Sequence, residues 1–555
     1  MANRVLTDAP STGPTAWWRD AVIYQVYVRS FADTDGDGIG DLAGVRARLP
    51  YLADLGVDAL WFTPWYASPM ADGGYDVADY RRIDPSFGAL AEAEELIAEA
   101  HRLGIRMIID VVPNHISDQH AWFQEALAAG PGSAARELFW FRPGRGEDGE
   151  LPPNNWKSEF GGPAWTRTPN PDGSPGEWYL HLFAAEQPDV NWNSDKVREE
   201  HENILRFWFD RGADGVRIDS ATMPAKDPEL PDFSDDYLSR KHPFVDRDEV
   251  HDIYRAWRAV ADSYPEPKAL IGEVWMADPL RFANYLRPDE MHTAFNFDYL
   301  NCPWDAVRLR TVIDETLSAH APVGAPATWV LSNHDVTRHV TRYGRTDSAS
   351  GRSPKQHGAP SDLVLGTRRA RAALLLNLAL PGSCYLYQGE ELGLWEVSDL
   401  PDALRQDPFF HRSNGADMGR DGCRVPLPWS GSAVPFGFSP ADAQAEPWLP
   451  QPAAWADLTA EALTRDPDSV LNLYRTALRL RRAEPALHTE DFGWAGEPDP
   501  TALDFRRGGS FRCLVNFSDR ALPLPEHAGI LLSSEPLAED AAELPADTSV
   551  WLRTV

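Results

Sequence analysis

The sequence has few cysteines, and none of them form a pattern that binds a metal. Structural zinc sites use cysteine pairs separated by two to four residues, and no such cysteine pair is present. We therefore exclude that class of site and expect buried free thiols. The four cysteines, far apart in a chain of 555 residues, are Cys302, Cys384, Cys423 and Cys513.

Long apolar runs are also missing. The most apolar stretch, AALLLNLALPGSCYLY at 372–387, is too short and too interrupted to span a membrane. The first residues, MANRVLTDAPSTGPTAWWRD, lack the apolar core that a secretory signal requires. We therefore predict a cytoplasmic protein that does not bind membranes.

Positive charge is scarce relative to negative charge. Lys and Arg total 52 against 84 Asp and Glu, so the formal net charge is 52 − 84 = −32. This excess argues against nucleic acid and anionic membrane surfaces as partners. It fits a soluble protein that binds a small neutral ligand. We expect this protein to be a monomer or a homodimer. Aromatic residues are abundant, and tryptophan rings can stack on the faces of sugars.

Short apolar segments alternate with amphipathic helical patterns over the first two thirds of the chain. Strands separated by helices predict a parallel sheet, and eight such units predict a (β/α)₈ barrel, also called a TIM barrel. The eight strand candidates are AVIYQVYVRSF, VDALWFTP, IRMIIDVVPNH, ADGVRIDS, KALIGEVW, HTAFNFDYL, PATWVLSNHD and GSCYLYQGEE.

Three departures from this alternation predict the domain organisation. Residues 114–186 are rich in proline, glycine and tryptophan, and we read them as a domain inserted after strand three. The barrel domain then takes residues 1–113 and 187–486, with an elaborated loop after strand eight. Residues 487–555 show short strands and turns, which predict a C-terminal antiparallel β-domain.

Acidic and polar side chains stand at the predicted strand ends, where barrel enzymes place their catalytic groups. Buried unpaired charge costs several kcal/mol, so acids on three strands of one barrel indicate an active site rather than packing. The strand-end residues are Asp110, Asn114, His115, Arg217, Asp219, Glu273, His334 and Asp335.

Carboxylates without a serine or thiol nucleophile favour glycoside chemistry. Alternate residues of a strand face the same side, so Arg217 can hold Asp219 ionised as a nucleophile. Glu273 lies in the apolar segment ALIGEVW, which suits a proton donor. A retaining enzyme places these two carboxyl groups about 5 Å apart.

Four segments resemble, in order, the signature segments of the α-amylase family of glycoside hydrolases, family 13. They are DVVPNH (110–115), GVRID (215–219), GEVW (272–275) and SNHD (332–335). QPDVN (187–191) is similar to a fifth segment, typical of the branch with α-glucosidases and oligo-1,6-glucosidases. The family fold is a (β/α)₈ barrel with domain B inserted after strand three and a C-terminal β-domain.

The resemblance implies a retaining, double-displacement mechanism that needs no cofactor for catalysis. Asp219 would be the nucleophile, Glu273 the general acid/base and Asp335 the stabiliser of the transition state. Three further side chains would hydrogen-bond the sugar at the cleavage subsite, namely His115, Arg217 and His334.

ADGGYDVADY (71–80) and GRDGCRVPLPW (419–429) resemble paired segments of exo-acting α-glucosidases. There an aspartate and an arginine close the pocket around the terminal glucose, and they map onto Asp72 and Arg424. Tyr75, Phe160 and Phe183 would supply aromatic walls. In relatives the residue after the nucleophile selects the linkage. The small Ser220 implies a preference for α-1,4 bonds, as in maltose.

The segment DTDGDGIGD (33–41) begins like an EF-hand calcium loop. The pattern fails at its twelfth position, where Gly44 stands in place of a bidentate glutamate. In the same branch of the family, an acidic segment after strand one binds calcium or magnesium away from the active site. The ligands implied by this resemblance are Asp33, Asp35, Asp37, Asp41 and the carbonyl of Ile39.

Two other functions remain open. A transglycosylase or isomerase, such as a trehalose synthase or a sucrose-acting enzyme, uses the same residues. The charged RLDRD-type loop of sucrose isomerases is not present. A non-catalytic binding protein, like the amylase-like subunits of amino-acid transporters, would carry a membrane helix and usually lose catalytic residues. This sequence keeps all three acids.

Overall fold

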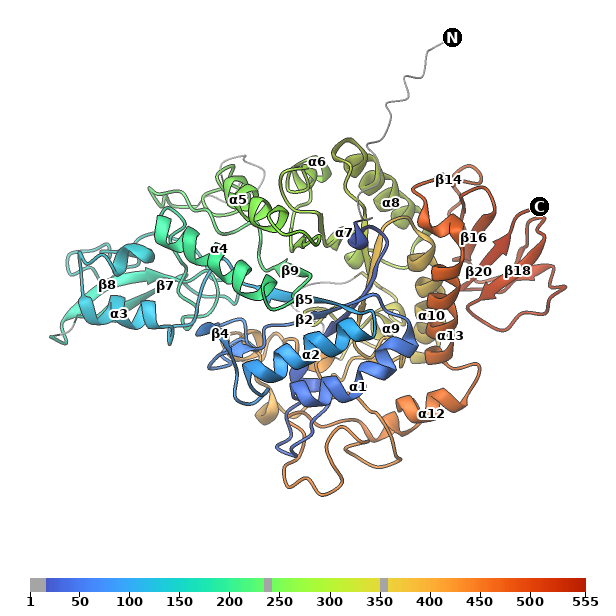
Figure 1. Ribbon diagram of the computed structural model, residues 1–555, viewed down its shortest axis with the longest axis horizontal. Coiled ribbons are helices and arrows are strands. Elements are labelled where there is room, and N and C mark those ends of the chain that lie inside the picture. Colours follow the sequence, from blue (N-terminus) through green and yellow to red (C-terminus); the bar gives the residue numbers. More distant parts are fainter. Residues whose placement is uncertain (1–15, 171, 234–241, 350–357) are drawn as a thin grey trace, which may run out of the picture.

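The computed structural model describes residues 16–170, 172–233, 242–349 and 358–555 (Figure 1). Residues 1–15, which the sequence assigns to the barrel domain, lie outside the described residues. Eight parallel strands form the central sheet, and each matches one of the eight predicted strands. They are β1 (Val22–Val26), β2 (Ala59–Phe62), β5 (Arg106–Val111), β9 (Gly215–Ile218), β10 (Ala269–Gly272), β11 (Thr293–Ala294), β12 (Thr328–Val330) and β13 (Ser383–Tyr387).

The sheet curls into a nearly closed barrel. Its strand order is β11-β10-β9-β5-β2-β1-β13-β12, so neighbours in sequence are neighbours in space. The two end strands meet through a hydrogen bond between the hydroxyls of Thr293 and Thr328. The predicted fold class, a (β/α)₈ barrel, is confirmed. All eight strands place their carboxyl ends at one face.

Helices surround the barrel, and their ends follow local sequence signals. The Asp41 carboxylate accepts a hydrogen bond from the Gly44 amide at the start of α1, and Gly56 ends that helix in the left-handed region at φ 95°. The longer helices are α1 (Leu42–Leu55), α2 (Leu90–Arg102), α4 (Asp195–Phe209), α5 (Val250–Asp262), α8 (Ala306–His320), α10 (Leu363–Ala379) and α13 (Val470–Ala483). Shorter ones are α6 (Pro279–Asn284), α7 (Phe297–Asn301), α9 (His339–Tyr343), α11 (Pro408–Arg412) and α12 (Ala460–Arg465).

The chain between β5 and β9 builds a separate layer at one end of the molecule (Figure 1). A cluster of buried aromatic side chains, including Trp140, Trp156 and Phe160, forms its core. This layer lies within residues 114–186, the range predicted for the inserted domain. Its elements are α3 (Ala121–Ala129), β6 (Phe141–Arg142), β7 (Trp165–Pro169) and β8 (Pro175–Leu180), and the hairpin β3 (Tyr66–Ala67) and β4 (Asp79–Ile83) follows β2.

Antiparallel strands form the opposite end of the molecule (Figure 1). The Trp551 indole and the Ser549 hydroxyl donate to carbonyls of α10, at 3.0 and 2.8 Å, and so fix this sheet to the barrel. The predicted C-terminal β-domain is confirmed. Its main sheet has the order β14 (Phe492–Trp494), β15 (Ala502–Arg507), β16 (Phe511–Asn516), β20 (Thr548–Arg553) and β18 (Gly529–Ser533), with a pair formed by β17 (Leu522–Pro523) and β19 (Glu543–Leu544).

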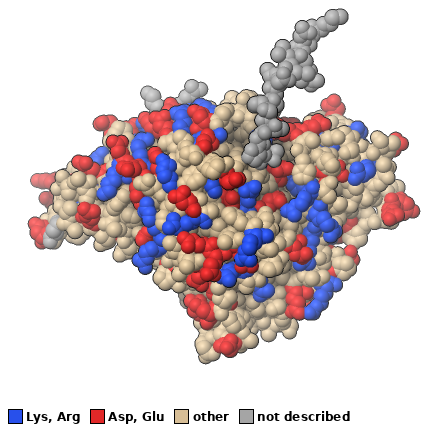
Figure 2. Space-filling model, in the orientation of Figure 1, with Lys and Arg blue, Asp and Glu red and all other residues tan. Residues whose placement is uncertain are grey.

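All four cysteines are buried free thiols, as expected. On the face shown in Figure 2, acidic and basic side chains are interspersed. Among the described residues, no helix combines the length and apolar character that a bilayer crossing would require.

Candidate active site

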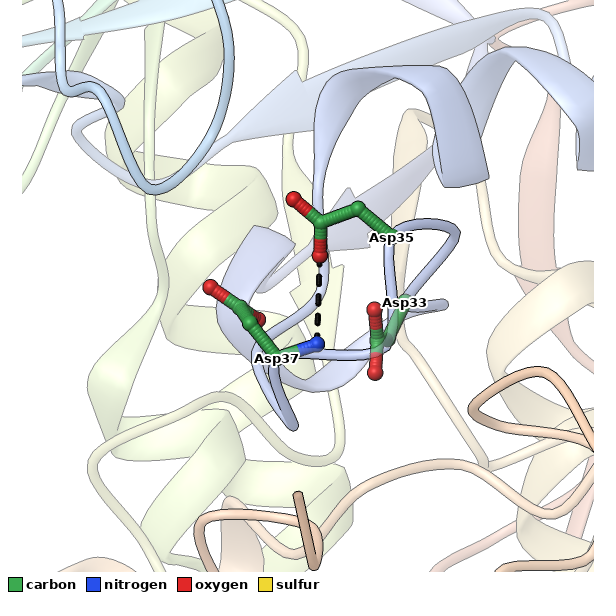
Figure 3. A group of neighbouring side chains, drawn as sticks. All are labelled: Asp33, Asp35 and Asp37. Carbon is green, nitrogen blue, oxygen red and sulfur yellow. Dashed lines mark hydrogen bonds between the residues drawn. The ribbon is translucent and has the colours of Figure 1, made fainter. Parts of the chain in front are cut away.

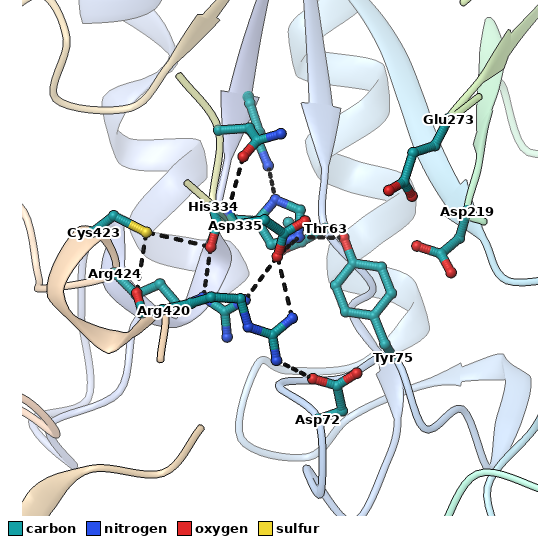
Figure 4. Close-up of polar contacts among 12 residues, drawn as sticks. Thr63, Asp72, Tyr75, Asp219, Glu273, His334, Asp335, Arg420, Cys423 and Arg424 are labelled. Carbon is teal, nitrogen blue, oxygen red and sulfur yellow. Dashed lines mark hydrogen bonds and ion pairs between the residues drawn. The ribbon is translucent and has the colours of Figure 1, made fainter. Parts of the chain in front are cut away.

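A pocket of about 480 Å³ opens at the carboxyl ends of the barrel strands. It contains the three acids that the sequence singled out, Asp219, Glu273 and Asp335 (Figure 4). The predicted aromatic walls line it as well. Its lining residues are Asp72, Tyr75, His115, Phe160, Phe183, Asp219, Ser220, Glu273, His334, Asp335, Phe409 and Arg420.

One buried guanidinium holds three carboxylates behind this pocket. Arg217 Nη1 donates to Asp219 at 2.7 Å and to both oxygens of Asp110 at 3.0 Å, while its Nη2 donates to Glu273 Oε2. Burial raises the pKa of Asp219, and Arg217 opposes that rise. Burial likewise raises the pKa of Asp110 to about 7 against the pull of Arg217. The arginine therefore keeps negative charge available where water is largely excluded.

The backbone after Asp219 adds a second donor to this cluster. Ser220 lies in the left-handed region at φ 43°, which costs a non-glycine residue about 1–2 kcal/mol. In this conformation its amide donates to Glu273 Oε2 at 3.1 Å. The strain therefore aims a backbone N–H at a functional carboxylate.

Asp335 lies on the other side of the pocket, between two arginines. Its Oδ1 is 3.2 Å from Arg420 Nη1 and 3.2 Å from Arg424 Nη2. The neighbouring His334 is buried between Gln25, 2.6 Å from Nδ1, and the Tyr75 hydroxyl, 2.8 Å from Nε2. Burial holds the pKa of His334 well below its usual value. The imidazole is thus neutral at pH 7 and offers a hydrogen bond rather than a charge.

The structure corrects the pairing predicted for Asp72. Its partner is Arg420, whose Nη2 donates to Asp72 Oδ1 at 2.6 Å (Figure 4). Arg424 instead donates from Nε to the His334 carbonyl at 2.9 Å and does not line the pocket. A 3₁₀ turn over Asp421–Cys423 separates the two arginines and turns only Arg420 toward Asp72.

The sequence reasoning missed two lining residues, Phe409 and Arg420, and also Asp407, which holds Arg420 from behind. Asp407 binds Arg420 Nε at 2.7 Å and caps α11 by accepting from the Phe409 amide. Burial raises the pKa of Asp407, but Arg420 outweighs this effect and the pKa falls to about 2. Phe409 packs edge-on against Phe160, with ring centroids 4.7 Å apart. The sequence DPF indicates that Asp407 caps a helix, but nothing in it indicates that Asp407 also binds Arg420.

Gln187 connects the fifth family segment to the pocket. Its Nε2 lies 3.1 Å from Asp72 Oδ2 and 3.0 Å from His115 Nε2. Burial and the nearby Lys226 lower the pKa of His115 to about 3, so this imidazole is also neutral. The His115 ring leans on Phe183, 4.8 Å between centroids, which places it beside the aromatic wall.

The acidic loop after β1 brings together three of its four aspartates. One carboxylate oxygen from each of Asp33, Asp35 and Asp37 lies within 4.8 Å of the others (Figure 3). Asp41 is not in this group. Its oxygens accept from the amide of Thr34 in the loop and from the amide of Gly44 in the first turn of α1. The carboxylate donor set fits a hard divalent cation.

The twelfth position of this loop could not carry an EF-hand glutamate. Gly44 lies in the first turn of α1, and a Cβ there would approach the Ala32 carbonyl oxygen to 2.1 Å. The backbone at Ala32 thus packs closely against the first turn of α1, and the geometry of this loop differs from that of an EF-hand.

A parallel barrel with acids on a shared arginine, opening into a pocket with aromatic walls, defines a barrel glycoside hydrolase. The protein-family model of the α-amylase catalytic domain matches residues 25–490 of this chain. The chain therefore belongs to the α-amylase family, glycoside hydrolase family 13.

Curated relatives match most of the chain. A probable α-glucosidase of Rhizobium meliloti (strain 1021) is 38% identical over 532 residues, covering 91% of this chain and 90% of the relative. An oligo-1,6-glucosidase of Parageobacillus thermoglucosidasius is 32% identical, covering 92% of each. A trehalose-6-phosphate hydrolase of Escherichia coli (strain K12) is 34% identical, covering 91% and 92%.

Solved structures show the same architecture. The α-glucosyl transfer enzyme XgtA superposes with a TM-score of 0.84 at 35% identity, covering 98% of this chain and 100% of that one. The trehalulose synthase MutB of Pseudomonas mesoacidophila MX-45 superposes with a TM-score of 0.84 at 29% identity, with the same coverage. Hydrolases and transferases thus both occur among the chain's relatives.

Proposed function

We propose that this protein is an exo-acting, retaining α-glucosidase that releases glucose from the non-reducing end of short α-1,4-linked oligosaccharides. The ion pair between Asp72 and Arg420 carries the proposal. It lies in the same pocket as Asp219, Glu273 and Asp335 and closes that pocket to a longer chain. Only a chain end then fits.

The chemistry follows from the acids around Arg217. A carboxylate oxygen of Asp219 forms a bond to the anomeric carbon while Glu273 gives its proton to the departing glycosidic oxygen. A water molecule then gives a proton back to Glu273 and attacks the same carbon, which releases Asp219 and glucose. Arg217 favours the charged form of this nucleophile by donating a hydrogen bond to it. Asp335 faces the pocket from the far side and stabilises the developing positive charge of the sugar.

The remaining lining residues bind a neutral sugar. Arg420 is the basic side chain among the lining residues, and it is bound by Asp72, Asp335 and Asp407. A phosphate in this pocket would meet more carboxylates than cations, which disfavours phosphorylated glucosides at the cleavage subsite. His115, His334 and Arg217 supply hydrogen bonds, while Tyr75, Phe160 and Phe183 supply apolar faces.

We also propose that the loop of Asp33, Asp35 and Asp37 binds a structural Ca²⁺ or Mg²⁺, with the Ile39 carbonyl as a further ligand. Three carboxylates gathered within 4.8 Å repel one another, and a divalent cation relieves that repulsion. The cation would stabilise the fold without taking part in catalysis.

Glucosyl transfer is the second candidate function. Similarity to the α-glucosyl transfer enzyme XgtA favours it, because transfer and hydrolysis share the first chemical step and differ in which acceptor attacks second.

The deciding experiment is product analysis with the purified protein. We expect the protein to release p-nitrophenol from p-nitrophenyl α-glucoside and to cleave little starch. From maltose it should release glucose that is initially the α-anomer. Initial β-glucose would rule out retention. Formation of trisaccharides or of sucrose isomers as the main products would favour transfer, and cleavage inside starch chains would rule out exo action.

A further inference from the structure

Trp275 is a residue of the GEVW segment that the proposed mechanism leaves without a role. It follows Glu273 by two positions, and its indole Nε1 donates to Glu273 Oε1 at 2.7 Å. The indole lies flat on Phe297 at the start of α7, with ring centroids 3.6 Å apart and an interplanar angle of 8°. The direction of the N–H donor is therefore fixed by a second aromatic ring.

The two oxygens of Glu273 have different surroundings. Oε2 accepts from Arg217 Nη2 and from the Ser220 amide at 3.1 Å. A proton on Oε2 would point at two donors that have no lone pair to receive it. Among the described residues, the hydrogen bond to Oε1 comes from the indole N–H alone. We therefore assign the proton to Oε1.

We propose that Trp275 is a positioning residue, which holds Glu273 Oε1, the proton-carrying oxygen, in place and aims it at the glycosidic oxygen. In the first step the Oε1–H bond breaks and the proton goes to the leaving oxygen as its bond to the anomeric carbon breaks. In the second step Oε1 takes a proton from the attacking water. The inference rests on the proposed α-glucosidase function.

The support for Trp275 extends into the barrel. Phe297 packs against Phe295 with ring centroids 6.1 Å apart, and Phe295 packs against Trp61 at 5.1 Å. Trp61 in turn donates to Asp110, which is held by Arg217. The charged groups around Glu273 are thus Arg217, Asp219 and Asp110, and both of its oxygens are anchored to the same rigid frame.

The test compares Trp275→Phe, which keeps an aromatic ring and removes the N–H, with wild type on α-glucosides of graded leaving-group ability. A positioned general acid contributes about 10²–10⁴-fold, and poor leaving groups need it most. For Trp275→Phe we expect kcat/KM on maltose and methyl α-glucoside to fall on the order of tenfold to a hundredfold. The p-nitrophenyl glucoside should lose less than about threefold.

A second readout is the pH profile. An N–H donor favours the ionised carboxylate, so its loss favours the protonated form. The basic limb of kcat/KM against pH should therefore move to higher pH in Trp275→Phe. Phe297→Leu keeps the N–H and loosens its direction. It should show the same leaving-group pattern with a smaller amplitude, and it carries the test if Trp275→Phe does not fold.

An equal loss on all substrates with an unmoved basic limb would overturn the inference, because a merely structural role predicts that pattern. Unchanged kinetics on maltose would overturn it too. A wild type that cleaves none of the glucosides would instead refute the proposed function.

Discussion

Arg420 and Asp72 are 348 positions apart in the chain, and they form a 2.6 Å ion pair in the lining of the pocket. Asp407 holds the same guanidinium from behind and reaches its Nε at 2.7 Å. The proposed grip on a terminal sugar therefore depends on contact between the loop after the last barrel strand and the loop after the second.

Arg420→Ala should raise KM for maltose by at least about tenfold, because it removes a bidentate side chain from a buried pair and leaves Asp72 without its cationic partner. Arg420→Lys should recover little, since a single ammonium cannot span Asp72 and Asp407. Steady-state kinetics check this, with the exposed helix arginine in Arg465→Ala as control. Unchanged KM in Arg420→Ala would contradict the role given to the ion pair.

Replacing the acids tests the mechanism. Asp219→Asn should lower kcat on every glucoside by about 10³-fold or more, because no nucleophile remains. Glu273→Gln should spare p-nitrophenyl α-glucoside relative to maltose, since a good leaving group needs little protonation. Thermal melts confirm folding, and normal maltose turnover by Asp219→Asn would reject the assignment.

Ser220→Val and Ser220→Thr test linkage preference as a matched pair. Both side chains are branched and equally strained at φ 43°, so their difference isolates the hydroxyl. We expect wild type to prefer maltose over isomaltose. Both variants should shift kcat/KM toward isomaltose, by about tenfold to two hundredfold and more strongly for valine. A wild type that prefers isomaltose would show that linkage is set elsewhere.

Removing a divalent cation should lower the melting temperature more than the initial activity. Bound cation stabilises only the folded state, by about 2.7 kcal/mol at a hundred times its Kd. Asp35→Asn should destabilise the protein in calcium and have no effect in chelator. Asp41→Ala removes the cap of α1 and should cost about 1 kcal/mol in both conditions. Identical melts with and without chelator would argue against a bound cation.

Stability should fall as the solution is acidified from about pH 7 to 5, in part because of buried neutral histidines. Burial lowers the pKa of His201 to about 4, below its value in the unfolded chain. The folded state thus binds fewer protons, so this stability is present above the unfolded pKa of about 6.5 and is lost as the pH falls toward 4.

His201→Gln isolates this contribution. Glutamine keeps a donor for the Val197 carbonyl and cannot titrate. When the pH is lowered from about 7 to about 5, the free energy of unfolding of this variant should fall by about 2 kcal/mol less than that of wild type. Urea unfolding at each pH measures the difference, and parallel pH curves would contradict the assignment.

The amino-acid sequence by itself determined the barrel strands and the acids at their ends. Strands alternate their side chains with a period of two, and each ends in a short motif, so local sequence fixes both Arg217 and Asp219 and the side of the strand they face. The eight strands and the antiparallel C-terminal sheet are found as predicted. These features depend on residues that are neighbours in the chain, so the sequence alone is sufficient to predict them.

Only the tertiary structure decided which side chain grips Asp72. Arg420 and Arg424 both stand in the segment GRDGCRVPLPW, and no local pattern distinguishes them. The choice depends on a 3₁₀ turn and on Asp407, in a loop without helical or strand period. The sequence likewise did not show that Asp41 caps α1, a contact that arises because the folded loop turns its carboxylate toward the Gly44 amide. Such contacts depend on long-range packing of irregular loops, which no periodic pattern in the sequence predicts.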